Sequence, residues 1–284
     1  MADGNSLINF GDISKPATVL IEKISAAVGI VFEPQRVKRM ARAEAEADKI
    51  KALARIELSE IEHRAIERLI AQESRKQNNI EQITAQAIDF LPINADVENL
   101  NEDWTAHFFK QCDTVSDKEM QSLWAKLLSG EATKPGTFSK RTVNFVSTME
   151  KGDAELFTNL CSFAWRLEEP VIIVMDPRHE IYNSRGINFN TLKHLDTIGL
   201  ISFDNVSGYV KTQMEPNYSA QYFEHKIQLK IPKQFDRLDI GKALLTNLGK
   251  ELFGLSGAVA DPEYYVHILN TWANKDVITY SKLD

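Results

Sequence analysis

The chain has 284 residues, of which 43% are hydrophobic and 26% are charged. This composition is that of an ordinary globular protein, and the length predicts about two domains with room for a sizeable core. The net charge of -7 excludes a whole-surface attraction to nucleic acid or to anionic lipid, although it leaves room for a local basic patch.

Residues 1–34 form an amphipathic N-terminal segment. Leu20, Ile24 and Val31 fall on one helical face, and a basic cluster follows Pro34. An apolar segment followed by cations can lie in a membrane interface, with the cations near lipid phosphates. The alternative is a short core helix followed by a solvated basic turn. The candidate residues for membrane or anionic-surface contact are Leu20, Ile24, Val31, Arg36, Lys38, Arg39 and Arg42.

Residues 35–91 contain neither Gly nor Pro and are rich in strong helix formers, which predicts a long helical stalk. Between residues 35 and 90 there are eleven basic and ten acidic side chains, as on a helix surface with many ion pairs. A long helix with a narrow apolar stripe usually pairs with another helix, so we expect self-association, as in a coiled coil, or packing within the chain. Residues 77–79, Gln-Asn-Asn, predict a break.

Residues 96–169 predict a small helical bundle. Apolar and aromatic side chains recur at helical spacing in successive stretches, as Trp104 and Phe108 do in the first of them. Gly130 follows Leu127 and Leu128, and we expect it to end its helix as a left-handed cap.

Residues 170–284 predict an α+β domain. Val171–Val174 is typical of a buried strand, Gly208 marks a hairpin, and a last helix is expected from about Pro262 to Asn274. The fold class is therefore mainly α with a C-terminal α+β part.

The C-terminal part resembles winged-helix domains. The residues that carry the resemblance are Leu192, Leu195, Gly199, Leu200 and Ile201, followed by a hairpin and by Leu245, Thr246, Gly249 and Leu252. The resemblance implies a recognition helix, whose candidate nucleic-acid contacts are Asn190, Thr191, Lys193 and His194. Eight basic and seven acidic residues between 186 and 255 give a poor footprint for DNA, so a protein-binding use fits better.

The whole chain resembles a family of bacterial proteins known as domain of unknown function 2806. The resemblance rests on residues 29–34 (GIVFEP), on residues 124–131 (WAKLLSGE) and on the Leu-Thr-x-x-Gly-x-x-Leu segment at 245–252. The layout is also similar, more distantly, to the Abi-alpha group linked to abortive infection of phage-infected bacteria. The resemblance to the first family implies no functional residues. The resemblance to the second implies a role in phage defence but no particular reaction or ligand.

No catalytic signature appears in the chain. Phosphate-binding Gly-rich loops and the G-x-S-x-G elbow are absent, and no two of the six histidines have H-x-x-x-H spacing, so we expect no cofactor and no metal site. The local candidate for a hydrolase or nuclease is the turn Asp176–Glu180, which follows an apolar strand. The alternative interpretation of these residues is a solvated turn that starts at Asp-Pro.

We expect a non-enzymatic interaction or effector protein of a bacterial phage-defence system that oligomerises through its N-terminal helix. The alternatives are a membrane-interface effector that uses residues 16–42 and a DNA-binding regulator. The expected partners are a second copy of the chain and an unidentified protein, with a membrane surface as an alternative. Two isolated cysteines, Cys112 and Cys161, and an N-terminus without a secretory pattern favour the cytoplasm, or the inner-membrane periphery in the membrane alternative.

Overall fold

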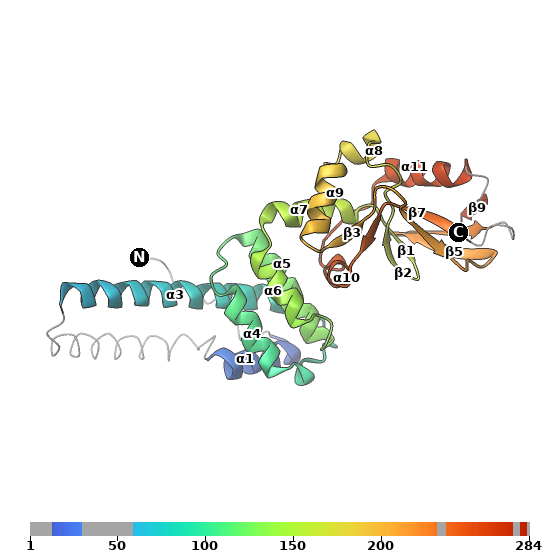
Figure 1. Ribbon diagram of the computed structural model, residues 1–284. Helices are drawn as coiled ribbons and strands as arrows, with labels where there is room; N and C mark the ends of the chain where they lie inside the picture. The colour runs from blue at the N-terminus through green and yellow to red at the C-terminus, as the bar shows by residue number, and fades with distance from the viewer. Residues whose placement is uncertain (1–12, 30–58, 232–236, 275–278, 283–284) are drawn as a thin grey trace. The chain divides into compact units, whose positions relative to one another are not determined.

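A computed structural model describes residues 13–29, 59–231, 237–274 and 279–282 (Figure 1). The chain divides into two compact units, residues 1–148 (unit 1) and residues 149–284 (unit 2). The structure is mainly helical with a smaller region of antiparallel strands, which confirms the predicted fold class at this level.

Unit 1 is helical in its described part. Its elements are α1 (Lys15–Val28), α3 (Glu60–Asp89), the 3-10 turn η1 (Val97–Asn99), α4 (Glu102–Cys112), α5 (Lys118–Thr133) and α6 (Lys140–Thr148). Side chains fix where the helices begin: Ser14 caps α1, and Ser59 forms a capping box with Glu62 at the start of α3. α1 packs against α4, and α3 packs against α5.

The core of unit 1 is aromatic. The ring of Phe108 lies 5.1 Å from that of Trp104, 5.0 Å from that of Phe109 and 5.1 Å from that of Trp124. The indole N–H of Trp104 donates to the carbonyl oxygen of Phe138 at 2.8 Å, so this polar group is satisfied although it is buried. Burying each such side chain stabilises the unit by about 1.5–3 kcal/mol.

α3 has two different halves. Its buried residues lie between Asn79 and Ala87, where the helix meets α4 and α5, and Figure 1 shows its N-terminal half extending beyond those helices. The predicted break at residues 77–79 is wrong, because α3 is continuous. The Asn79 carboxamide donates to the carbonyl of Asp113 at 2.8 Å and so does not compete for the helix backbone.

Gly130 does not end its helix, because α5 continues to Thr133. A Cβ atom at position 130 would lie 2.7 Å from Cε2 of the Phe138 ring. The glycine therefore permits close packing of an aromatic ring against α5, a role that a helix-end pattern in the sequence does not distinguish.

Unit 2 combines short helices with strands. The helices are α7 (Lys151–Cys161), α8 (Glu180–Asn183), α9 (Phe189–Thr197), α10 (Asn247–Phe253) and α11 (Pro262–Ala273). The strands are β1 (Ala164–Leu167), β2 (Glu169–Ile172), β3 (Ile201–Phe203), β4 (Tyr209–Thr212), β5 (Asn217–Tyr222), β6 (His225–Lys230), β7 (Arg237–Gly241), β8 (Ala243–Leu245) and β9 (Thr279–Lys282).

A five-stranded sheet has the order β2-β1-β5-β6-β9, and β3-β8 and β4-β7 form two-stranded sheets. The predicted hairpin around Gly208 is wrong, because the strands before and after it pair with β8 and β7. The physical reason is an Asx turn, in which the carboxylate of Asp204 accepts from the amides of Val206 and Ser207. After this turn β4 pairs with β7 and does not pair with β3.

Gly241 lies at the kink between β7 and β8. Its φ of +89° falls in the left-handed region that side chains disfavour, and it forms a parallel bridge with Val174. A Cβ atom here would lie 2.3 Å from the carbonyl oxygen of Val174. That oxygen accepts from the amide of Lys242 at 2.8 Å, so it is held in place.

The boundary between the units falls between Thr148 and Met149, whereas the sequence interpretation placed α7 in the helical bundle of residues 96–169. α7 belongs to unit 2 because it packs against α9. The hydroxyl of Thr158 on α7 also donates to the carbonyl of Ser256 at 3.0 Å.

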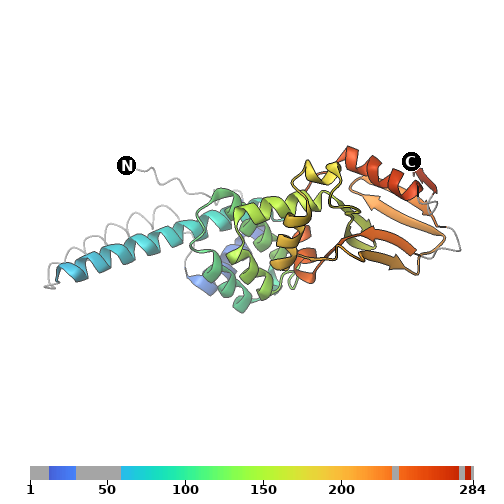
Figure 2. The same cartoon turned by 45° about the horizontal axis from the view of Figure 1, so that its top comes forward.

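α11 lies along the five-stranded sheet (Figure 2). The ring of Tyr265 stacks on Trp165 of β1, Tyr222 of β5 and His225 of β6. The hydroxyl of Tyr264 lies 2.9 Å from the carbonyl oxygens of both Phe163 and Ile173. Aromatic rings from α11 therefore close the core of unit 2.

Each unit contains one free cysteine. Cys112 lies in unit 1 and Cys161 in unit 2, and both side chains are fully buried. Burial raises the pKa of the Cys161 thiol to about 12 and that of the Cys112 thiol well above its usual value. Both thiols are therefore protonated at neutral pH.

Candidate functional site

The N-terminal candidates for membrane contact are only partly described. Leu20 and Ile24 lie on α1 and are 0% exposed, which corrects their assignment to a membrane surface in this structure. Apolar spacing alone does not reveal that α4 covers this face of α1. The other five candidates, Val31, Arg36, Lys38, Arg39 and Arg42, lie outside the described residues. Among the described helices, none is both long enough and apolar enough to cross a membrane.

The candidate nucleic-acid contacts lie at and after the start of α9. Asn188, not Asn190, caps this helix, and the Asn190 side chain is exposed. The Thr191 hydroxyl completes the cap by accepting from the amide of Asn188 at 2.8 Å.

The two basic side chains of α9 have acidic partners. Lys193 lies 2.6 Å from Asp196, and His194 lies 2.6 Å from Asp153 of α7. A phosphate would therefore compete with a carboxylate at both positions. This arrangement weakens the case for α9 as a recognition helix.

The turn Asp176–Glu180 is organised by its own side chains. The Arg178 guanidinium lies 3.1 Å from both carboxylate oxygens of Asp176, and these bonds hold the pKa of Asp176 below its usual value. His179 uses its Nδ1 to accept from the amide of Ile181 and so caps α8. An ion-paired carboxylate and a capping imidazole match the solvated-turn interpretation more closely than an acid/base pair.

His179 meets His267 of α11, although 88 positions separate them in the sequence. The two ring centroids are 4.3 Å apart, and Tyr182 lies beside both rings. Burial, and secondarily the neighbouring His179, lowers the pKa of His267. No group of three or more His, Cys, Asp or Glu side chains in the described part of the chain can hold a metal ion.

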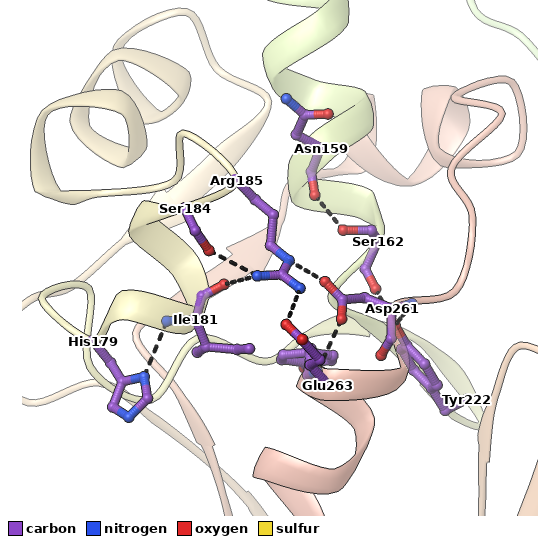
Figure 3. A network of polar contacts seen from close by, with 10 residues as sticks. Asn159, Ser162, His179, Ile181, Ser184, Arg185, Tyr222, Asp261 and Glu263 are labelled. Carbon is purple, nitrogen blue, oxygen red and sulfur yellow. Dashed lines mark hydrogen bonds and ion pairs between the residues drawn. The ribbon is translucent and has the colours of Figure 1, made fainter.

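A dense network of polar contacts in the described part of unit 2 is centred on Arg185, just after α8 (Figure 3). Its guanidinium donates to the carboxylate of Asp261, to Glu263 Oε2 at 2.9 Å, to Ser184 Oγ at 2.7 Å and to the carbonyl of Ile181 at 3.3 Å. The Arg185 side chain is 27% exposed and that of Asp261 is 12% exposed, so water screens their ion pair only in part. We call this network the Arg185 clamp.

Asp261 extends the clamp to the sheet. Its Oδ1 caps α11 by accepting from the amide of Tyr264 at 3.0 Å, and its own amide donates to the Tyr222 hydroxyl at 2.7 Å. That hydroxyl in turn donates to the carbonyl of Ser162 at 2.7 Å. The clamp therefore joins α8, α11, β5 and the end of α7 (Figure 3).

A cavity of about 590 Å³ lies beside the clamp and is lined by Arg185, Asp261, the end of α7 and residues 257–263. The guanidinium faces two carboxylates and two further oxygens, so few of its donors remain for a ligand. The arrangement is suited to holding elements together and offers no nucleophile beside a base.

The Arg185 clamp was not predicted from the sequence, because Arg185 and Asp261 are 76 positions apart. The one local signal is Asp261-Pro262, which is typical of a helix start.

A family model described as a protein of unknown function (DUF2806) matches residues 63–269, well over half of the sequence. The chain belongs to this family. The match confirms the resemblance to this family, and it includes the motifs at 124–131 and 245–252 but not the one at 29–34. No curated protein and no solved structure matches the chain significantly.

The DUF2806 match includes the whole Arg185 clamp and the four α9 candidates, but α1 with Leu20 and Ile24 precedes it. The description of the DUF2806 family names no activity. Functional assignments for this member therefore come from its own residues.

Acid is expected to destabilise unit 2 through His267. Because the folded state lowers the pKa of His267 below 6.5, the unfolded state binds a proton more readily, and stability falls as the pH drops below that value. One such group contributes at most about 1.4 kcal/mol per pH unit, and partial exposure reduces this further. Urea unfolding at about pH 7.5 and pH 5.5 measures the effect. His267→Gln should shrink the difference between the two pH values, and an unchanged difference would contradict the assignment.

Proposed function

We propose that this protein is a non-enzymatic interaction protein that self-associates through the N-terminal half of α3. The observation that carries the proposal is a set of large apolar side chains on this surface. Ile61 is 71% exposed, and Leu69, eight residues later on the same face of the helix, is 57% exposed. Apolar groups at helical spacing on one helix commonly mark a surface that another helix covers.

A second copy of the same helix suits this surface. In an antiparallel pair with its two-fold axis at Ala65, Ile61 of one helix lies opposite Leu69 of the other. The same register leaves only a small alanine at the axis, where the helices approach most closely. The apolar positions Ile61 and Leu69 are thus complementary to each other in the pair.

We propose further that residues 192–252 act as a winged-helix-like module for binding protein. The support is the order α9, β3, β8 and α10, together with the tight contact of its motif residues. Thr246 caps α10 and donates to the carbonyl of Gly199 at 2.7 Å. A Cβ atom at Gly249 would lie 2.1 Å from the carbonyl oxygen of Leu200, so glycine is required there. The paired state of Lys193 and His194 favours protein over DNA as the partner.

The biological setting that we propose is a bacterial phage-defence system in the cytoplasm. This proposal rests only on the resemblance to the Abi-alpha group that was drawn from the sequence, and the description of the matched family names no such role. The membrane alternative has less support, because Leu20 and Ile24 are buried.

Leu69→Glu is expected to convert the oligomer to a monomer of 32.2 kDa. A carboxylate at this position would lie in the apolar centre of the paired helices. Each of the two copies loses a leucine contact of about 2 kcal/mol, which together weakens association about a thousandfold. Size-exclusion chromatography with light scattering on the full-length chain, at micromolar concentration, gives the mass directly.

Ser74→Glu is the matched control, because it adds the same charge to an exposed position of the same helix on the face opposite Ala65. The control should keep the mass of the unmodified protein. A monomeric unmodified protein, or an oligomer that Leu69→Glu leaves intact, would overturn self-association through α3.

A further inference from the structure

A polar groove lies in unit 1 between α3 and the start of α5. Its volume is about 540 Å³. Every residue that lines it is polar or cationic, and none is a carboxylic acid: Arg75, Asn78, Asn79, Gln82, Gln86, Ser116, Lys118 and Gln121. We call it the amide groove.

The α3 side of the amide groove is a row of carboxamides. Asn78, Gln82 and Gln86 follow one another at steps of four residues, and their side chains bond to no described residue. Four residues of helix span about 6 Å, whereas two residues of extended chain span about 6.2 Å in polyproline II and about 6.6 Å in a strand. The row therefore nearly matches the repeat of an extended peptide backbone.

The wall of the groove is rigid and buried. Asn79 is 2% exposed and Gln121 is 4% exposed. The Gln121 amide donates to the carbonyl of Val115 at 2.9 Å and to Asn79 Oδ1 at 3.3 Å, and the Asn79 amide donates to the Asp113 carbonyl and to Ser116 Oγ. Because carbonyl oxygens only accept, these bonds fix the orientation of both carboxamides.

One acceptor of this wall is unused. With its N–H groups committed, Gln121 turns its Oε1 to a position where no described residue donates to it. This oxygen is not one of the fully buried atoms that lack a partner, so water reaches it from the groove, and a ligand that brings an N–H group can replace that water. The oxygen of Gln121 and the free carboxamides of α3 line the same groove.

The groove also presents two cations without acidic partners. Arg75 and Lys118 are exposed and form no ion pair within the described part of the chain. The neighbouring carboxylates are engaged elsewhere: Glu73 and Asp113 face Lys76, and Asp117 caps α5. The groove therefore attracts negative charge.

We propose that the amide groove binds an extended, acidic segment of a partner protein. The carboxamides pair with its backbone N–H and C=O groups, and Arg75 and Lys118 pair with acidic side chains along it. Main-chain hydrogen bonds supply affinity in such recognition, and alternate side chains supply specificity. No aromatic ring lines the groove, so a nucleotide base has nothing on which to stack. The proposal is independent of self-association, because the groove lies at the other half of α3.

The test uses the full-length chain and a fluorescent peptide of eight residues that alternates Glu and Ser. Fluorescence anisotropy at low ionic strength should show saturable binding that salt weakens, and no binding of a peptide that alternates Lys and Ser. Two further versions of the acidic peptide carry N-methyl groups on the odd-numbered or on the even-numbered residues. One of the two should bind at least about tenfold more weakly, because methylation removes the backbone N–H donors that face the groove.

Two variants locate the site. Arg75→Glu is expected to weaken binding about five- to tenfold and Gln82→Ala about fivefold. Arg68→Glu makes the same charge reversal on the same helix outside the groove, and it should leave binding unchanged. Far-ultraviolet circular dichroism should show all three variants folded.

Three results would overturn the proposal. They are an absence of binding by the acidic peptide, equal weakening by Arg75→Glu and Arg68→Glu, and full binding of both N-methylated peptides. Displacement of the acidic peptide by inorganic phosphate or adenosine monophosphate at equal concentration would also overturn it, in favour of a small phosphorylated ligand. None of these readouts depends on the mass of the oligomer, so this proposal and self-association through α3 fail separately.

Discussion

Gly241→Ala is expected to lower the free energy of unfolding of unit 2 by about 3 kcal/mol or more. A positive φ at a residue with a side chain costs about 1–3 kcal/mol, and a Cβ atom 2.3 Å from the Val174 carbonyl oxygen forces the backbone apart. That oxygen also accepts from Lys242, so any shift weakens a second contact. Urea unfolding followed by the near-ultraviolet circular dichroism of tyrosine measures the effect, because the seven tyrosines all lie in residues 149–284.

Gly254→Ala is the matched control for this substitution. Gly254 has an ordinary φ of -64°, and a Cβ atom there would meet nothing within 4 Å. Its effect should stay within about 0.5 kcal/mol. Equal stability of the Gly241 and Gly254 variants would show that the kink between β7 and β8 relaxes without cost.

Alkaline solution is expected to unfold unit 2 before unit 1. Burial raises the pKa of Tyr182, Tyr222 and Tyr264 above the usual 10.0, so the folded unit keeps these protons at pH values where the unfolded chain loses them. Stability is therefore fully present below about pH 10 and falls above it. Each tyrosine contributes about 1.4 kcal/mol per pH unit, so the three together remove about 4 kcal/mol at about pH 11.

Unit 1 has no tyrosine, and the buried cysteine that each unit contains adds a similar term to both. Ultraviolet absorbance of tyrosinate during an alkaline titration should show a cooperative step, and the step should coincide with loss of unit 2 structure. Tyr264→Phe should make the fall in stability shallower by about one third. A gradual titration of all tyrosines near the usual pKa, without a step, would contradict the expectation.

The helices of unit 1 were largely predictable from the sequence because their signals are local. Apolar spacing and capping side chains act within one or two turns, as Ser59 and Glu62 do at the start of α3. Residues 77–79 misled because an Asn-rich stretch is typical of breaks, whereas here Asn79 finds its partners on the connection between α4 and α5. These contacts form only in the folded unit, so the sequence near Asn79 does not predict them.

Sites assembled from distant residues were not predictable. Arg185 and Asp261 meet only because α8 and α11 are neighbours in the folded unit, and Arg75 and Lys118 meet only across α3 and α5. The face of α1 shows the same limit, since core and membrane faces share one apolar spacing. The sequence identified the Asp176–Glu180 turn as a candidate site. It did not reveal that His179 lies against His267, which is on a distant helix.

Because each unit contains a single buried cysteine, the reactivity of the two thiols measures whether each unit has unfolded. A reagent that reacts with thiolates reaches Cys112 only when unit 1 opens, and it reaches Cys161 only when unit 2 opens. The same holds for cellular oxidants, so the modification state of these two sulfur atoms records which half of the molecule has been unfolded. Mass spectrometry of two peptides thus distinguishes damage to the helical unit from damage to the unit that contains the sheet.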